Sequence, residues 1–177
     1  MLKPLKRIAI TGPESTGKTW LAQNLARRYH TVAVPEFSVE YLSEHGPAYT
    51  LEDIVNIAKG QLSLEEQYAA KANRLLFCDT DLIVCKIWSE VVFKKVPEWI
   101  DKMVRQHRYD LYLLCSPDVA WQPGPFRENP EDRDYLFDLY ETELVTRGFP
   151  YAIISGEGKE RLENAVKFVE EIILQSI

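Results

Sequence analysis

Short apolar runs alternate along the chain with longer stretches in which apolar residues recur at helical spacing. The short runs lie at residues 7–11, 31–35, 75–79, 110–114 and 151–154, and helical spacing marks residues 18–29, 37–45, 51–73, 82–93, 97–106, 130–146 and 159–174. Nearly uninterrupted apolar runs are typical of strands that are buried on both faces of a parallel sheet. The pattern therefore predicts an α/β fold, in which helices cover both faces of a five-stranded parallel sheet.

Polar residues follow each of the predicted strands. They lie at residues 11–12, 35–36, 79–81, 116–118 and 155–156. Sheets of this kind bind their ligands in a crevice at the carboxyl ends of the strands. We therefore expect these polar residues to converge on one crevice.

Composition and charge narrow the class of protein. The 177 residues are 46% apolar and 27% charged, which fits one globular domain over residues 1–177. The formal net charge of −6 argues against nucleic-acid binding, which needs a basic face. No apolar run approaches the ~20 residues of a membrane span, and the start lacks a secretory signal, so we expect a cytoplasmic protein without membrane contact.

The sequence contains three cysteines, Cys78, Cys85 and Cys115. They stand singly, which indicates buried reduced thiols and not a metal site.

Residues 12–19 read G-P-E-S-T-G-K-T and match the phosphate-binding loop GxxxxGK[ST], between a predicted strand and a predicted helix. In such loops the backbone N–H groups surround the phosphates, the lysine reaches the β and γ oxygens, and the last hydroxyl reaches Mg²⁺. We therefore expect ATP and Mg²⁺ as cofactors, Lys18 as a catalytic residue and Thr19 as a metal ligand. The predicted ATP-binding residues are Gly12, Pro13, Glu14, Ser15, Thr16, Gly17, Lys18 and Thr19.

Two aspartates follow the third predicted strand. Asp79 stands where a Walker-B carboxylate would stand, and we expect it to hold Mg²⁺ directly or through water. Asp81 is a candidate to share the metal, to contact the acceptor, or only to cap the helix predicted to begin at Leu82.

A glutamate ends the second predicted strand. Glu36 is a candidate to accept a proton from a substrate hydroxyl or to hold ribose hydroxyls, although a carboxylate that opens a helix is also a common cap. Glu40, one helical turn later, either contacts the substrate or lies on a solvated helix face.

Residues 116–134 are rich in proline and charge and lie between the fourth and fifth predicted strands. We predict that they form a mobile lid, over about residues 117–134, whose cations neutralise the moving γ-phosphoryl when it closes. Arg127 and Arg133 are the candidates, against the alternative that they pair with acidic neighbours on the surface. Trp121 is a candidate to stack on a flat base of the acceptor.

Four segments of the chain resemble the NadR-like ribosylnicotinamide kinase domains in order and spacing. They are G-P-E-S-T-G-K-T, P-E-F-S-V-E-Y-L, L-F-C-D-T-D and P-D-V-A-W-Q-P-G-P-F-R-E-N, and the likeness covers essentially the whole chain. That family belongs to the P-loop nucleoside and nucleotide kinases. The resemblance implies a P-loop NTPase fold and ATP-dependent phosphorylation of nicotinamide riboside to nicotinamide mononucleotide, a step of NAD salvage. Only the D-T-D run and the lid tryptophan are specific, because the phosphate loop is generic.

This chain departs from the family pattern in two respects. The family often carries an arginine within E-x-x-R-E, where this chain has Val39, so any role of that arginine is lost. Full-length NadR proteins also carry an adenylyltransferase domain before the kinase, whereas 11 residues precede Gly12 here. We therefore expect a stand-alone kinase domain without adenylylation or repressor activity.

The charges near the acceptor favour a nucleoside. A nucleotide acceptor would bring a phosphate dianion and need arginines, whereas this end of the crevice offers Glu36 and Glu40. Carboxylates and aromatic faces suit a cationic nicotinamide ring, and neutral nucleosides remain compatible. The expected partner is thus a small nucleoside; a kinase for another small acceptor and a nucleotide-dependent binding switch are the alternatives. The sequence leaves the oligomeric state open, a homo-oligomer included.

Overall fold

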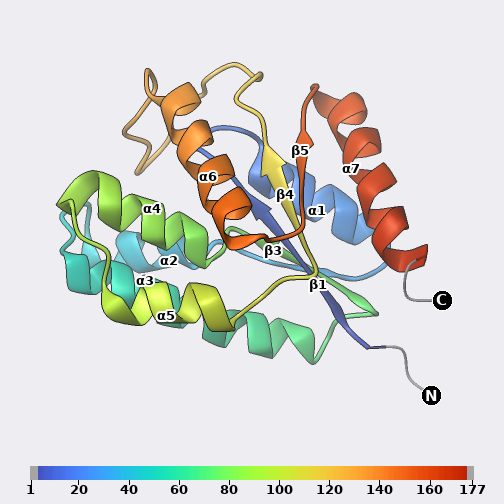
Figure 1. Ribbon diagram of the computed structural model, residues 1–177, viewed down its shortest axis with the longest axis horizontal. Helices are drawn as coiled ribbons and strands as arrows, with labels where there is room; N and C mark the ends of the chain where they lie inside the picture. Colours follow the sequence, from blue (N-terminus) through green and yellow to red (C-terminus); the bar gives the residue numbers. More distant parts are fainter. Residues whose placement is uncertain (1–3, 175–177) are drawn as a thin grey trace.

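The computed structural model describes residues 4–174, which form a central sheet between two layers of helices (Figure 1). The strands pair in parallel in the order β2-β3-β1-β4-β5. They are β1 (Lys6–Thr11), β2 (Val32–Val34), β3 (Leu75–Asp79), β4 (Leu111–Cys115) and β5 (Tyr151–Ile154). The helices are α1 (Lys18–Arg28), α2 (Phe37–His45), α3 (Leu51–Ala69), α4 (Leu82–Phe93), α5 (Glu98–Gln106), α6 (Arg133–Arg147) and α7 (Gly158–Leu174).

The three central strands supply most of the buried sheet. Every residue of β3 and β4 is buried, as are the last four residues of β1. Because side chains alternate along a strand, Ile8 and Ile10 of β1 pack in the layer under α1 and α7, and Ala9 packs in the larger layer under α2 to α6. The predicted burial of both sheet faces is therefore confirmed.

Each predicted strand and helix is present, and only the ends differ. Helix α3 ends at Ala69, four residues earlier than predicted, because Lys71 and Ala72 donate to the carbonyls of Tyr68 and Ala69 and so tighten the chain into turns. Helix α6 begins at Arg133, three residues later than predicted, since residues 130–132 belong to the preceding loop. Both differences lie at the ends of elements, where sequence patterns are least informative.

Helix α2 crosses α3 at a glycine. A Cβ atom at Gly60 would lie 2.0 Å from Cε1 of Phe37, so the ring fits there only because the side chain is missing. The neighbouring Gln61 is 2% exposed; its Oε1 accepts the Phe37 N–H at 2.9 Å and its Nε2 donates to the Pro35 carbonyl at 3.3 Å. These contacts hold the start of α2, and with it Glu36, at the carboxyl end of β2.

The three cysteines are buried and free of disulfide bonds, as their separate positions predicted. Cys78 lies in β3, Cys115 in β4 and Cys85 in α4. Burial raises the pKa of the Cys115 thiol to about 11, so this thiol stays protonated near neutral pH. Among residues 4–174 no helix combines the length and the apolar character that a membrane crossing requires.

Candidate active site

The loop between β1 and α1 has the geometry of a phosphate cradle. Gly12 has a φ of +126°, and a Cβ there would lie 2.9 Å from the carbonyl oxygen of Cys115, so the position requires glycine. Gly17, with a φ of +77°, turns the chain directly into α1. The Thr16 hydroxyl donates to the Pro13 carbonyl at 2.8 Å and closes the loop. The start of α1 is thereby directed at any anion in the loop.

Lys18, the first residue of α1, covers this loop. Its ammonium donates to the carbonyl oxygens of Gly12 at 3.0 Å and Pro13 at 2.6 Å. A phosphate oxygen is a charged and therefore stronger acceptor than a carbonyl. Rotation of the lysine side chain would exchange the two carbonyls for the phosphates.

Asp79 and Thr19 form a pair beside the loop. The Thr19 hydroxyl donates to Oδ2 of Asp79 at 2.6 Å, while the buried Oδ1 of Asp79 accepts no hydrogen bond from the described residues. Burial, reinforced by the charge of nearby Glu36, raises the pKa of Asp79 to about 6. An unpaired carboxylate oxygen next to a hydroxyl suits Mg²⁺, which keeps few protein ligands and shares the substrate's phosphates.

This pair would not hold a metal ion alone. Within residues 4–174, no group of three or more His, Cys, Asp or Glu side chains is placed to bind a metal. Water and phosphate oxygens would have to complete the coordination of Mg²⁺ at Thr19 and Asp79.

Asp81 caps α4. Its Oδ1 accepts from the backbone N–H of Val84 and from the Thr11 hydroxyl, both at 3.1 Å. Its Oδ2 is buried and accepts no hydrogen bond from the described part of the chain, and burial raises the pKa of Asp81 to about 7. The capping role is thus present, and a contact of Oδ2 with metal or acceptor stays a prediction.

Glu36 occupies the N-cap position of α2, but its carboxylate does not cap the helix. Oε1 of Glu36 accepts from the Ser38 hydroxyl at 2.6 Å, and Gln61 caps the Phe37 N–H in its place. The capping alternative for Glu36 is therefore wrong. Glu40 is exposed and its side chain makes no hydrogen bond within residues 4–174, which matches a solvated helix face.

The lid segment crosses to the phosphate loop. Residues 116–132 join β4 to α6 without helix or strand. Nη1 of Arg127 donates to Oγ of Ser15 at 3.4 Å, and Nη1 of Arg133 donates to the carbonyls of Ser15 at 3.0 Å and Val119 at 2.9 Å. Neither arginine forms an ion pair with an acidic residue in the described part of the chain, so the alternative of surface pairing is wrong. Motion of the lid stays a prediction.

Trp121 is half-buried and already has a partner within the lid. The guanidinium of Arg133 lies 5.7 Å from the centroid of the Trp121 ring, within the range of a cation–π contact. The ring therefore supports an arginine that reaches the phosphate loop. A contact of Trp121 with the acceptor stays a prediction.

Sequence reasoning missed one residue of the site. Arg161, on α7, is 1% exposed and donates to the carbonyls of Thr16 at 2.9 Å, Ser116 at 3.0 Å and Gly156 at 2.7 Å, and it pairs with Asp118. It thus joins the phosphate loop, the end of β4 and the turn before α7. The only signal was an arginine at a position of the helix where the periodicity calls for an apolar residue.

The fold and the site together define a P-loop nucleotide-binding protein. The parallel sheet, the glycine loop between its central strand and α1, and the Thr19–Asp79 pair are the parts of that class. Residues 7–161 match the family model described as an AAA domain. The chain belongs to this family, and the match extends from β1 through the turn that Arg161 holds.

Two curated relatives are NadR proteins. The chain is 26% identical over 176 residues to the trifunctional NAD biosynthesis/regulator protein NadR of Escherichia coli (strain K12), which covers 96% of this chain and 43% of that protein. It is 26% identical over 121 residues to the protein of the same name from Salmonella typhimurium, covering 66% of this chain and 30% of that protein. The resemblance to NadR is confirmed, and the chain spans less than half the length of these relatives.

Solved structures show the same fold. A crystal structure of the NadR protein in complex with NR has a TM-score of 0.84 at 23% identity, over 95% of this chain and 50% of that chain. The NadR protein in complex with NAD and AMP-PNP has a TM-score of 0.80 at 24% identity, over 95% and 49% of the two chains. A deoxyadenosine kinase from M. mycoides has a TM-score of 0.63 at 13% identity, over 93% and 99%. The predicted P-loop fold is confirmed.

Proposed function

We propose that this chain is a nucleoside kinase that transfers the γ-phosphoryl group of Mg·ATP to the primary hydroxyl of a nucleoside, with nicotinamide riboside as its preferred acceptor. The observation that carries the proposal is the meeting of two lid arginines with a phosphate loop that adjoins the Thr19–Asp79 pair. The proposal concerns this chain alone and does not include the further activities implied by the names of its NadR relatives.

The phosphate loop would bind the triphosphate. Its backbone N–H groups would surround the β-phosphate, and Lys18 would leave its two carbonyl partners for the β and γ oxygens. Thr19 and Asp79 would hold Mg²⁺, which when bound neutralises charge on the β and γ oxygens. Asp79 must be ionised for this role, and the positive charges of metal and lysine favour the ionised form.

The transfer step would rest on charge and position. The acceptor oxygen forms a bond to the γ-phosphorus, the bond from that phosphorus to the bridging oxygen breaks, and ADP leaves. Glu36 or Asp81 would orient the hydroxyl and take its proton; Glu36 is the more accessible, since Asp81 is 1% exposed. Arg127 and Arg133 would stabilise the charge on the moving group.

Two considerations support nicotinamide riboside as the acceptor. One of the structures with the same fold is that of NadR protein in complex with NR, the usual abbreviation for nicotinamide riboside. In addition, Glu36 places negative charge on the acceptor side, where a cationic ring is favoured and a nucleotide's phosphate is not. Neither consideration rests on the generic phosphate loop.

The test is ADP release with Mg·ATP and a panel of nucleosides that includes nicotinamide riboside, with each product identified by mass. We expect strong stimulation by nicotinamide riboside and a product heavier by one phosphate. Stimulation by a different nucleoside alone would replace the acceptor. ATP binding without stimulation by any nucleoside would favour the nucleotide-dependent switch.

Two variants locate the chemistry. Lys18→Ala should lower kcat/KM by about a hundredfold or more while the protein still folds, because the hydrogen bonds of Lys18 go only to loop carbonyls. Glu36→Gln should lower kcat by about a hundredfold if Glu36 accepts the proton. Glu40→Gln, one turn away and exposed, is the matched control and should leave kcat unchanged. Full activity of Lys18→Ala would contradict the assignment of the phosphate loop.

A further inference from the structure

The phosphate loop contains a carboxylate. Glu14 lies among residues that are predicted to bind a triphosphate, where a negative charge opposes binding unless it is directed elsewhere. Its Oε2 accepts from the backbone N–H groups of Glu128 at 2.9 Å and Asn129 at 3.2 Å, and its Oε1 accepts from Nδ2 of Asn129 at 3.4 Å. All three donors belong to the lid, so the charge of Glu14 is directed at the lid and not at the phosphate site.

The lid presents a fixed partner to this carboxylate. Two successive backbone N–H groups form a concavity that binds anions. Just before them Phe126 turns the chain with a φ of +64° and packs against the core layer under α2 to α6. The Glu128 carboxylate accepts from the Tyr49 hydroxyl at 3.1 Å, which in turn accepts from Nε1 of Trp88 at 2.9 Å. The lid backbone to which Glu14 binds is therefore also held to the rest of the molecule, through Phe126 and through the Tyr49–Glu128 contact.

Ser15 of the phosphate loop makes a second contact with the lid, at a residue that precedes Arg127 in the chain. The Ser15 hydroxyl accepts from the backbone N–H of Gln122 at 2.9 Å. Glu14 holds residues 128–129 and Ser15 holds residue 122, so Arg127 lies between two points of attachment to the phosphate loop. A side chain between two fixed points loses less freedom when it engages a phosphate.

We propose that Glu14 is a positioning residue, which holds residues 128–129 of the lid on the phosphate loop and thereby places Arg127 for phosphoryl transfer. The inference rests on the proposed kinase function. Glu14 acts through Arg127 and not on the reacting atoms, so its loss should affect kcat more than the binding of ATP. The same loop would thus bind the triphosphate through its backbone and the lid through its side chains.

The kinetic test compares three variants. Glu14→Ala removes all three acceptor contacts and should lower kcat about tenfold, while KM for ATP does not rise, because a negative charge near the phosphates is also removed. Glu14→Gln keeps one oxygen for the two backbone donors and should retain kcat within about threefold. Glu131→Ala, which removes an exposed lid carboxylate that makes no hydrogen bond within residues 4–174, should match the unmodified protein. A higher KM for ATP with unchanged kcat in Glu14→Ala would overturn the proposal.

A second measurement does not depend on catalysis. The bond after Arg127 should be cut by trypsin more slowly while the segment is held on the phosphate loop, so the rate of limited digestion of the full chain reports the attachment. We expect the bond between Arg127 and Glu128 to be cut about tenfold faster in Glu14→Ala, and at the original rate in Glu131→Ala. Unchanged cutting in Glu14→Ala would overturn the proposal. Faster cutting in a protein that phosphorylates no nucleoside would support the attachment and contradict the kinase function.

Discussion

Asp79 would combine its proposed role as a metal ligand with a cost in stability. Burial and the charge of Glu36 raise the pKa of this carboxyl to about 6, so the folded protein holds the proton more tightly than the unfolded chain, whose carboxyl has its ordinary value of 3.8. Protonated Asp79 therefore contributes to the stability of the fold. This contribution is fully present below pH 3.8 and is lost as the pH rises through about 6. At neutral pH the ionised carboxylate therefore destabilises the fold unless a metal or lysine compensates it.

Asp79→Asn should accordingly stabilise the protein while abolishing phosphoryl transfer. Without Mg²⁺ and nucleotide, its free energy of unfolding should exceed that of the unmodified protein by about 2 to 3 kcal/mol at pH 8, and the difference should shrink toward pH 4. Urea denaturation at several pH values measures this. Asp138→Asn, on the exposed face of α6, is the control and should change little. Lower stability of Asp79→Asn at pH 8 would contradict the desolvation argument.

Trp121 contacts Arg133 and is also proposed to stack on the base of the acceptor. We expect Trp121→Ala to raise KM for the acceptor about tenfold, with little change in KM for ATP, if the ring stacks on the base. Trp121→Phe keeps an aromatic face and should stay within about threefold of the original KM. A lower kcat with unchanged acceptor KM would instead show that the ring only supports Arg133.

At the scale of the elements, apolar periodicity was sufficient to predict the strands and helices. Runs such as Leu75–Asp79 and Leu111–Cys115 are buried on both faces, and this burial is what makes them uninterrupted in sequence. The end of α3 could not be predicted as well, because backbone turns and not side-chain character terminate this helix.

In the candidate site, too, some residues could be predicted from local sequence patterns and others could not. The phosphate loop and Asp79 follow from local spacing, because motif and strand end lie within a few residues of each other. The attachments of Arg127 and Arg133 to Ser15 join positions more than 100 residues apart, and no local pattern encodes such a pairing. Arg161 was missed for the same reason, since three of its acceptors are backbone carbonyls, which every residue type supplies.

The packing of α2 on α3 links the fold to Glu36. Gly60→Ala should destabilise the protein by about 1 to 3 kcal/mol, because the new Cβ would lie 2.0 Å from the Phe37 ring, although alanine forms helix better by roughly 1 kcal/mol. Since Phe37 follows Glu36, kcat should fall as well. Urea midpoints and kcat measure the two effects, and Ser63→Ala, at an exposed position of the same helix, is the control. A stabilised Gly60→Ala variant would mean that the ring moves aside freely.

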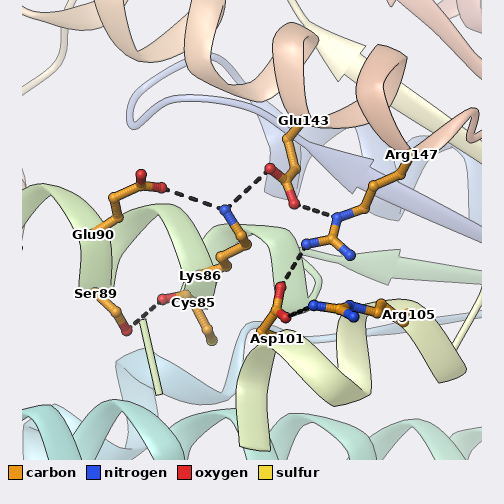
Figure 2. A network of polar contacts seen from close by, with 8 residues as sticks. All are labelled: Cys85, Lys86, Ser89, Glu90, Asp101, Arg105, Glu143 and Arg147. Atoms are coloured by element: carbon orange, nitrogen blue, oxygen red, sulfur yellow. Dashed lines mark hydrogen bonds and ion pairs between the residues drawn. The ribbon is translucent and has the colours of Figure 1, made fainter. Parts of the chain in front are cut away.

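At the scale of the whole molecule, a chain of charged residues joins three helices that cover one face of the sheet (Figure 2). Lys86 on α4 pairs with Glu143 on α6 at 3.0 Å, and Arg147 on α6 pairs with Glu143 and, at 2.7 Å, with Asp101 on α5. Asp101 also accepts from Arg105 within its own helix. The chain of contacts thus runs from α4 through α6 to α5.

Arg147 is the member of this network that holds α6 to α5. Partial burial works in the opposite direction, but the hydrogen bonds from Arg147 and Arg105 lower the pKa of Asp101 below its ordinary value of 3.8. The ion pair therefore stabilises the fold above that value, and its contribution is lost as the pH falls below it. Arg147 is 15% exposed, so solvent screens this contact only in part.

Arg147→Met should lower the free energy of unfolding by about 1 to 2 kcal/mol at pH 7, because Asp101 then keeps only the exposed Arg105 and Glu143 keeps only Lys86. Arg105→Met is the matched control: Arg105 pairs with the same aspartate but is 67% exposed, so its loss should cost less than about 0.5 kcal/mol. Urea denaturation in low and high salt measures both. Equal losses in the two variants would mean that burial does not strengthen the contact. Phosphoryl transfer well below the melting temperature should be unchanged, because Arg133, at the other end of α6, is held by Ser15 and Val119.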